Sequence, residues 1–437
     1  MSEQNTLTLI AILTADWHFV HNNWRHRPEI NGDAWTSLAQ VKYCEHAFGI
    51  PLIGAGDLLD SARPPSVIVG GLREVLSEYR TVSHGLYING NHDKVKPSWI
   101  NVLYGDAEYH DRSRWEGWHD LTKNPGRIQF GSPSYTVGIE KGVAQFKPKW
   151  TQECPAWTEP TDQWCAYGID YVETSDLLQE KLDELEPNIR QDTKNLLVLH
   201  QGVEGLLPKM AVELFDGMIP DGIDIVLCGH THIAKVLEIT TKSGRSIPLV
   251  SPGSLHLCSI DEDPRKKLYF LCNDGSVWSI PLVTRRVISV NFSGSTESEI
   301  RETAVKVIAS LNRKEKPATA KLREKINVPL LRVVYDTSTA PKVRSIFETA
   351  LRNAGATAHL FYKNNAEKIS NSLNTVVQDG MDTSFIHSGF DYAKAAFQKL
   401  EKDKKVRQIV ENLLDRQPSQ ENYDTLKEDF INATVRR

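Results

Sequence analysis

The sequence predicts an α/β protein in which two sheets pack together and helices flank them. Two observations carry this prediction. Up to about residue 230, apolar runs that suit buried parallel strands alternate with helical patterns. Between residues 234 and 282, short β-rich runs are separated by turn residues such as Asn273-Asp274-Gly275. We expect these later runs to form a second, antiparallel sheet packed on the first.

Five apolar runs in the first part have the length of buried strands, and each precedes a polar cluster. They cover residues 7–15, 50–55, 86–88, 196–199 and 223–228. Helices are expected over residues 67–79 and over residues 176–185, where Pro187 ends the pattern. The later β-rich runs cover residues 236–241, 247–250, 268–272 and 277–282.

The polar clusters hold the residue types that bind metal ions. They are Asp16-Trp17-His18, Gly56-Asp57-Leu58-Leu59-Asp60, Gly90-Asn91-His92-Asp93, His200 and Gly229-His230-Thr231-His232. In an open α/β sheet, sites gather outside the carboxyl ends of the strands, so clusters far apart in sequence can converge on one cleft. Each cluster alone is more often a turn or a polar core group. Five of them at strand ends favour a dinuclear metal site and phosphoester hydrolysis.

Seven side chains are candidate ligands, and four of them are imidazoles. They are Asp16, His18, Asp57, Asn91, His200, His230 and His232. Asp16 and His18 can turn onto one ion, as can the alternating pair His230 and His232, and Asp57 can place one oxygen on each metal. The imidazoles argue against magnesium and favour manganese, iron or zinc, among which the sequence does not choose.

Composition is that of a cytoplasmic protein of two or three domains. The chain has 437 residues, of which 40% are hydrophobic, and the apolar run near its start is too short to span a membrane. Six cysteines without a Cys-x-x-Cys spacing suggest reduced thiols. A net charge of -5 neither favours nor excludes a nucleic-acid partner. Basic groups could line a groove or be scattered surface charges: Lys94, Lys96, Arg285, Arg286 and residues 321–325.

The chain divides into four expected parts. Residues 1–290 form the catalytic domain, with an insertion at about 99–171 that holds six of the ten tryptophans. These rings form a small core of their own, or stack on bases or on a second subunit. Residues 291–365 form a small α/β unit, with helices over 297–313 and 341–353 and strands over 330–335 and 358–362. A linker, 366–388, precedes a helical segment, 389–437, whose apolar stripe docks in cis or on a partner.

Over residues 7–290 these clusters, with Arg63-Pro64-Pro65-Ser66 and Pro252-Gly253-Ser254, resemble the SbcD-type nucleases of double-strand-break repair and phage recombination, which are calcineurin-like metallophosphoesterases. The resemblance implies a metallophosphoesterase sandwich, a small DNA-capping domain and a C-terminal helical segment that binds an SbcC-like coiled-coil ATPase. It also implies a homodimer that acts on DNA. Phe19-Val20 departs from the family's usual Leu-Gly, and the insertion has no counterpart that we can place.

The resemblance also implies roles for individual residues. One manganese ion would be held by Asp16, His18, Asp57 and His232, and a second by Asp57, Asn91, His200 and His230. His92 would assist the leaving group. Asp93 and Asp60 are candidates to orient His92 or a metal-bound histidine, although Asp60 could instead cap the helix that follows.

Three functions compete at this point. The first is a manganese-dependent DNA exonuclease and endonuclease that works with an ATPase. The second is a phosphatase or small-molecule phosphodiesterase of the same fold, and the third is a metal-free structural or DNA-end-binding subunit. Protein phosphatases of this fold usually place an arginine soon after the Gly-Asn-His cluster, where this chain has Asp93-Lys94-Val95-Lys96. Every expected ligand is present, which argues against a metal-free subunit. We therefore expect a nuclease.

Overall fold

The computed structural model describes residues 6–7, 9–19, 24, 30, 33–48, 50–61, 63–77, 84–93, 117–122, 128–130, 135–140, 143–148, 164–311, 326 and 328–364. The expected linker and the helical segment 389–437 lie outside these residues, as do Lys94, Lys96 and residues 321–325. Within the described part of the chain, no helix is long and apolar enough to cross a membrane.

One six-stranded sheet has the order β15-β14-β2-β3-β4-β5. Its strands are β2 (Leu9–Thr14), β3 (Leu52–Ala55), β4 (His84–Ile88), β5 (Gly117–Asp120), β14 (Lys267–Cys272) and β15 (Val277–Pro281). Strands β2 to β5 are parallel, whereas β14 pairs antiparallel with β2 and with β15. The carboxyl ends of β2, β3 and β4 therefore lie at one edge of this sheet.

A second six-stranded sheet has the order β12-β13-β11-β10-β9-β6. Its strands are β6 (Ile128–Phe130), β9 (Trp164–Gly168), β10 (Lys194–His200), β11 (Ile225–Gly229), β12 (Lys235–Thr240) and β13 (Ser246–Ser251). Strands β9, β10, β11 and β13 are parallel, and β6 and β12 are antiparallel edge strands. This sheet thus has the same mixed pattern as the first.

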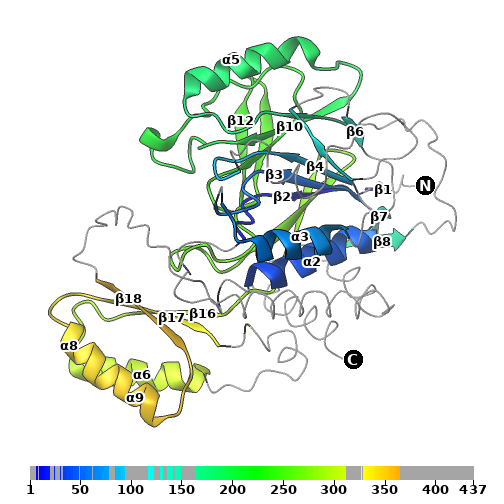
Figure 1. Cartoon of the computed structure of the whole chain (residues 1–437). Helices are drawn as coiled ribbons and strands as arrows, with labels where there is room; N and C mark the ends of the chain where they lie inside the picture. Colours follow the sequence, from blue (N-terminus) through cyan, green and yellow to red (C-terminus); the bar gives the residue numbers. More distant parts are fainter. Residues whose placement is uncertain are drawn as a thin grey trace.

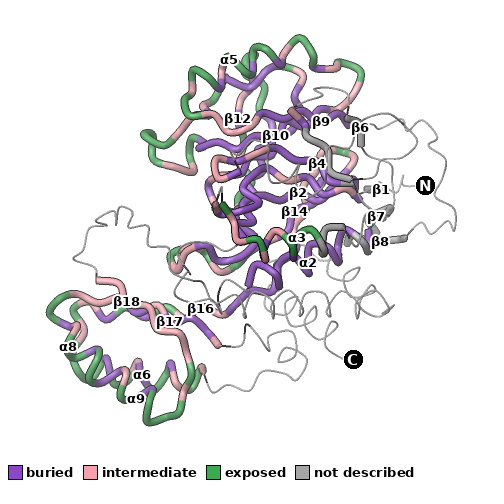
Figure 2. Tube along the Cα trace, viewed as in Figure 1, coloured by how far each residue is buried: buried purple, intermediate pink, exposed green. Residues whose placement is uncertain are grey.

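The two sheets pack face to face, and helices cover both outer faces (Figure 1). Helices α2 (Asp33–Phe48) and α3 (Ser66–Ser77) lie on one side, and α5 (Ser175–Leu185) lies on the other. Along β10, Leu196 and Val198 face the layer between the sheets, whereas Leu197 and Leu199 pack under α5. Because these strands are buried on both faces, their sequences are unbroken apolar runs. The same strands form the purple centre of Figure 2. The predicted two-sheet sandwich flanked by helices is confirmed.

The expected separate antiparallel sheet is wrong. The four later runs do form strands, but the hairpin β12–β13 joins β11 in one sheet, and the hairpin β14–β15 joins β2 in the other. Each hairpin thereby pairs an edge strand of a parallel core, which would otherwise present unpaired backbone groups.

The insertion at 99–171 contributes strands to the sandwich. β5 extends the first sheet, and β6 and β9 extend the second. A third, three-stranded sheet joins β7 (Tyr135–Glu140) and β8 (Val143–Pro148) to β1 (Thr6–Leu7). Trp164 is fully buried between the two large sheets, so this ring belongs to the main core. Trp99, Trp115, Trp150 and Trp157 lie outside the described residues, and only the backbone of Trp118 is described.

Residues 287–311 and 328–364 form a small α/β unit around a parallel three-stranded sheet. Its strands are β16 (Val287–Asn291), β17 (Leu330–Tyr335) and β18 (His359–Asn364). Its helices are α6 (Glu297–Leu311) and a run of α8 (Ala340–Lys342), a π-helical segment (Val343–Glu348) and α9 (Thr349–Asn353). The helices lie together on one face of the sheet (Figure 1). The strand β16 was not predicted.

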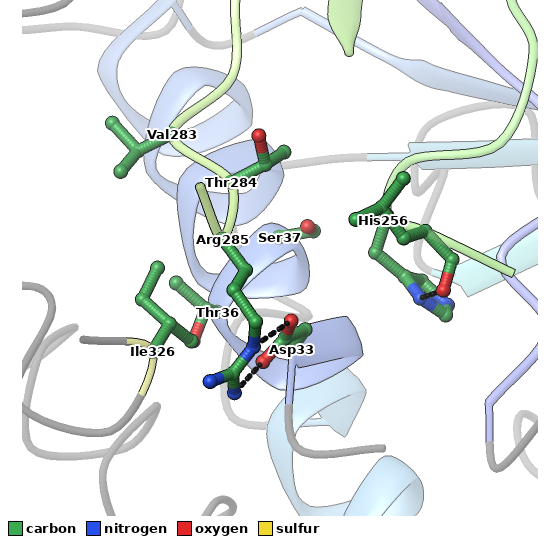
Figure 3. Close-up of a pocket in the computed structure, with 9 residues that line it drawn as sticks. Asp33, Thr36, Ser37, His256, Val283, Thr284, Arg285 and Ile326 are labelled. Atoms are coloured by element: carbon green, nitrogen blue, oxygen red, sulfur yellow. Dashed lines mark hydrogen bonds and ion pairs between the residues drawn. The ribbon is translucent and has the colours of Figure 1, made fainter. Parts of the chain in front are cut away.

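The buried side chain of Arg285 links helix α2 of the sandwich, through an ion pair with Asp33 (Figure 3), to the small unit, through a hydrogen bond. Arg285 donates to Asp33, at the start of α2, from Nε at 2.8 Å and from Nη2 at 2.7 Å, and its Nη1 donates to the carbonyl oxygen of Val328 at 2.8 Å. Arg285 is only 1% exposed. The suggestion that it lines a groove is therefore wrong, whereas Arg286 is partly exposed and donates to the Ser310 carbonyl.

The apolar stripe of helix α3, which the sequence places just after the second metal-binding cluster, is a candidate surface for the expected dimer. Its apolar residues Ile68 and Leu72 are fully buried in the core beneath the first sheet, and Val67 packs partly against that core. These side chains serve the sandwich itself, so they supply no evidence for a second subunit.

Candidate metal centre

The polar clusters meet where strands of the two large sheets end at their carboxyl termini. Asp16, Asp57 and Asn91 follow β2, β3 and β4 of the first sheet, while His200 ends β10 and His230 follows β11 of the second. The sequence predicted that these clusters converge on one cleft at the carboxyl ends of strands, and the structure shows that the strands belong to both sheets of the sandwich. All seven candidate ligands lie in this one region.

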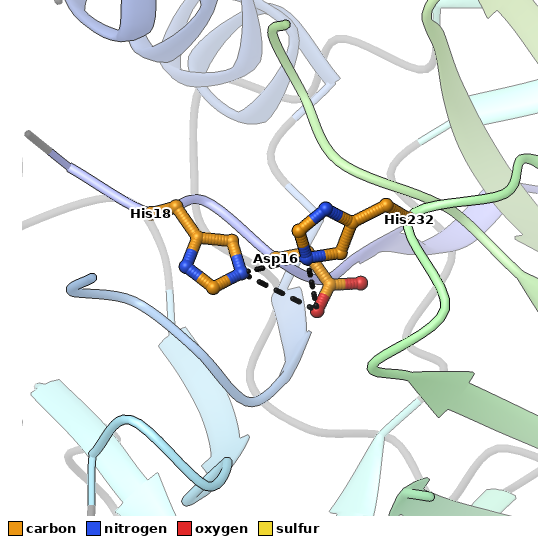
Figure 4. Close-up of side chains that lie close together, drawn as sticks. All are labelled: Asp16, His18 and His232. Atoms are coloured by element: carbon orange, nitrogen blue, oxygen red, sulfur yellow. Dashed lines mark hydrogen bonds and ion pairs between the residues drawn. The ribbon is translucent and has the colours of Figure 1, made fainter. Parts of the chain in front are cut away.

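The first group of ligand atoms consists of Asp16, His18 and His232 (Figure 4). The Nε2 atoms of His18 and His232 lie 2.8 Å apart, and Asp16 Oδ1 lies 3.9 Å from each. Asp16 and His18 are buried, whereas His232 is partly exposed. Two imidazoles that turn nitrogen atoms toward each other beside a carboxylate are suited to share a cation.

The second group consists of Asp57, His200 and His230, with Asn91 beside them. Asn91 Oδ1 lies 3.1 Å from His200 Nε2 and 3.0 Å from His230 Nδ1. Asp57 Oδ2 lies 3.2 Å from His200 Nε2 and 3.4 Å from His18 Nε2, so one oxygen lies between the two groups.

Two details differ from the sequence expectation. His230 and His232 are divided between the two groups and do not face one ion together. Asp57 does not offer one oxygen to each group, because its Oδ1 accepts a hydrogen bond from the backbone N–H of His92 at 2.9 Å.

The backbone at this site is strained. Every non-glycine residue with a left-handed φ in the described part of the chain is a candidate ligand: Asp16 (50°), His18 (39°), Asp57 (53°), His230 (85°) and His232 (55°). Such conformations cost roughly 1–3 kcal/mol each and persist only where surrounding contacts enforce them. Here the loops bind one another, since the backbone N–H groups of Asp16 and His18 donate to the carbonyl oxygens of Gly56 and Asp57.

Burial and the carboxylate of Asp57 together set the protonation of the imidazoles. Burial lowers the pKa of His18 to about 3, and burial together with His200 lowers that of His230 to about 4. For His200, burial also lowers the pKa, but the carboxylate of Asp57 more than offsets this and raises it to about 9. Neutral His18 and His230 keep a lone pair for a metal ion, whereas His200 would release its Nε2 proton on binding one. With that proton released, the donor set fits divalent cations.

Asp60 contacts both histidines that the sequence linked to it. Its Oδ1 lies 3.1 Å from His18 Nδ1, and its carbonyl oxygen accepts a hydrogen bond from His92 Nδ1 at 2.8 Å. It does not cap α3, which begins at Ser66. Asp60 is therefore placed to orient His92 through its backbone carbonyl, and its carboxylate lies beside the His18 ring.

His92 stands beside both groups. Its backbone is fixed by Asp57, its Nδ1 by Asp60, and its ring packs at 5.0 Å from that of His18 in an edge-on arrangement. The ring is also close enough to His18 and Asp57 to share a metal ion with them. Geometry alone thus permits His92 to serve as a proton donor or as a ligand.

Asp93 has a different role from the one expected. Its carboxylate is fully buried and accepts hydrogen bonds from the backbone N–H groups of Leu58, Leu59 and Gly90, at 3.1–3.3 Å. Burial and the nearby Asp57 raise its pKa to about 6. Among the described residues, Asp93 makes no hydrogen bond to His92 or to a candidate ligand histidine, but it fixes the two loops that carry Asp57 and Asn91.

Two residues near the site were missed in the sequence. Glu262 Oε1 lies 3.0 Å from His232 Nδ1, and the ring of Tyr171 lies 5.4 Å from that of His230. Glu262 lies thirty positions after His232 in a loop without a metal-binding spacing. Tyr171 is the last residue of the expected insertion. Neither position carries a local signal that would identify it.

A family comparison agrees with this geometry. The model of the calcineurin-like phosphoesterase family matches residues 11–234, which is slightly more than half of the chain. The chain belongs to the calcineurin-like phosphoesterase family. All seven candidate ligands lie inside the matched range, and Glu262 lies outside it. No curated protein matches the chain. As a calcineurin-like phosphoesterase, the protein is a metal-dependent hydrolase of phosphoesters.

Gly90 tests how closely the loops must approach. A Cβ atom at this position would lie 2.5 Å from the backbone nitrogen of Asp57 and closer still to its Oδ1. Gly90→Ala should therefore displace Asp57 and weaken metal binding at least tenfold in a calorimetric titration. Gly70→Ala in α3 is the matched control, because nothing lies within 4 Å of the added carbon. Equal metal affinity in both variants would contradict the expectation.

Proposed function

We propose that this phosphoesterase is a manganese-dependent DNA exonuclease and endonuclease, the nuclease subunit of a double-strand-break repair or recombination complex. The observation that supports cleavage of a diester is the sequence that follows His92. The next residue, Asp93, is buried and bonded to three backbone N–H groups. Its side chain is thus used within the loops, and the run Asp93-Lys94-Val95-Lys96 has no arginine where protein phosphatases of this fold usually place one to bind the phosphate dianion. The proposal that the substrate is DNA rests on the resemblance to SbcD-type nucleases.

Asp16, His18, Asp57 and His232 would hold one ion, and Asp57, Asn91, His200 and His230 the other. Two bound divalent ions would polarise the scissile phosphate and lower the pKa of a water to near neutrality. Iron or zinc would suit the same imidazole-rich donors. Asp57 suits the shared position, because its Oδ2 lies between His18 and His200.

His92 is the proposed acid. Because the Asp60 carbonyl oxygen can only accept, His92 keeps a proton on Nδ1. A second proton on Nε2 would then be the one transferred to the departing sugar oxygen. Asp60 and the Asp57 carboxylate fix the ring and its backbone, which is what a positioned proton donor requires.

The metal and substrate are tested in one assay. Purified protein with a linear duplex, a DNA hairpin and p-nitrophenyl phosphate should cleave the DNA substrates in manganese, far more slowly in magnesium, and not in EDTA, because the imidazoles disfavour magnesium. Efficient hydrolysis of p-nitrophenyl phosphate with intact DNA would instead identify a phosphatase or small-molecule phosphodiesterase. DNA binding without any hydrolysis would identify a structural subunit.

The role of His92 is tested by its removal. His92→Ala should lower the rate of DNA cleavage roughly 10²- to 10⁴-fold, as expected for a general acid. The variant should still bind two manganese ions in titration calorimetry. Loss of one ion would show that His92 is a ligand, which its position beside His18 and Asp57 allows.

Two partner proposals rest on the resemblance alone. The helical segment 389–437, outside the described residues, would bind an SbcC-like coiled-coil ATPase, and the protein would form a homodimer. Light scattering that detects only monomer at micromolar concentration would argue against the dimer.

Removal of the C-terminal segment separates catalysis from assembly. Every proposed ligand lies between Asp16 and His232, so a chain ending at His387 should retain manganese-dependent cleavage of nicked or single-stranded DNA. It should lose binding to the ATPase and any ATP-stimulated processing of duplex ends. A large fall in melting temperature in this variant would show that the segment packs on its own catalytic domain.

A further inference from the structure

A carboxylate supports His232 from the side opposite the metal ligands. Glu262 lies between β13 and β14, and its Oε1 is 3.0 Å from Nδ1 of His232. The other nitrogen of the same ring, Nε2, faces His18 and Asp16. The imidazole is therefore held between a carboxylate and the first group of ligand atoms, an arrangement that fixes ring orientation and raises the basicity of a metal-binding nitrogen.

Glu262 is itself firmly held. Its Oε2 accepts hydrogen bonds from Lys266 Nζ at 2.6 Å, from Ser254 Oγ at 2.8 Å and from the backbone N–H of Cys258 at 3.2 Å. Lys266 is only 3% exposed, and its Nζ also donates to Ser254 Oγ. With these donors on one carboxylate, the side chain has little freedom to move. Glu262, His232 and Cys258 lie close enough together to share a metal ion, but the ammonium group of Lys266 already balances the charge of Glu262, so we place no cation there.

The second group of ligands is supported differently. His200 Nδ1 donates to the carbonyl oxygen of Ala55 at 2.7 Å, which is a neutral acceptor. A carboxylate behind an imidazole is a stronger acceptor than a carbonyl oxygen. The two groups of ligands therefore differ in the acceptor that contacts the outer ring nitrogen of a histidine: a carboxylate for His232 and a carbonyl oxygen for His200.

We propose that Glu262 is a positioning residue for His232, and that it strengthens binding of the ion held by Asp16, His18 and His232 without affecting the other. The proposal rests on the two-metal site of the proposed function. It assigns a role to a residue that lies outside the range matched by the family model.

The test is a manganese titration of metal-free protein, which does not depend on catalytic activity. The wild-type chain should bind two ions. In Glu262→Ala one site should weaken by roughly 10- to 100-fold, as is typical when the group behind a ligand histidine is removed, while the other stays within about twofold. At intermediate manganese, the electron paramagnetic resonance spectrum should show isolated ions where the wild type shows a spin-coupled pair.

Two further variants separate this role from a structural one. Asp261→Asn removes the neighbouring carboxylate of the same loop, which binds Arg332 and Lys363 at 2.5 and 2.7 Å, and it should leave both metal sites unchanged. Glu262→Ala with Lys266→Met removes the ammonium group that the single variant leaves buried without its partner. This double variant should show the same loss at one site.

Several results would overturn the proposal. These are unchanged metal affinity in Glu262→Ala, an equal loss at both sites, an equal loss in Asp261→Asn, or recovery of wild-type affinity in the double variant. A wild-type chain that binds fewer than two ions would instead contradict the proposed two-metal site itself. The two failures are therefore distinguishable.

Discussion

The candidate site depends on the position of Asp57 between the two halves of the sandwich. Its Oδ2 lies between His18 from the first sheet and His200 from the second, while its Oδ1 accepts from the backbone of His92. To reach this position Asp57 adopts a φ of 53°, and Gly90 must lack a side chain. The buried carboxylate of Asp93 holds the backbone of the same two loops together. The strained turn at Asp57 thus lies at the centre of a site whose ligands follow or end five strands.

The sequence predicted the parts of this protein that are determined locally. Strand-end clusters are recognisable because a ligand must follow its strand directly, so Asp16, Asp57, Asn91, His200 and His230 could be placed beside strands from the sequence alone. The helices α3 and α5 were also predicted to within two residues, since periodicity and Pro187 mark them.

Pairings between distant segments could not be predicted in the same way. Nothing in the runs 236–241 and 268–272 tells which sheet edge each hairpin joins, because that choice depends on the edges left open elsewhere. The contacts of Arg285 with Asp33 and of Glu262 with His232 are equally non-local. Asp93 was misassigned for the same reason. Its neighbour in sequence, His92, suggested a partner, but its hydrogen bonds go to the backbone of three other residues.

The pairing of β2 with β14 has a consequence for how the chain is made. β2 carries Asp16 and His18 at its end, yet one of its two neighbours is β14, and Ala11 pairs with Leu271. During synthesis, β2 therefore keeps an exposed edge until more than half of the chain has left the ribosome. Exposed strand edges promote association between chains. Nascent chains that end before β14 should therefore be the species most in need of chaperones.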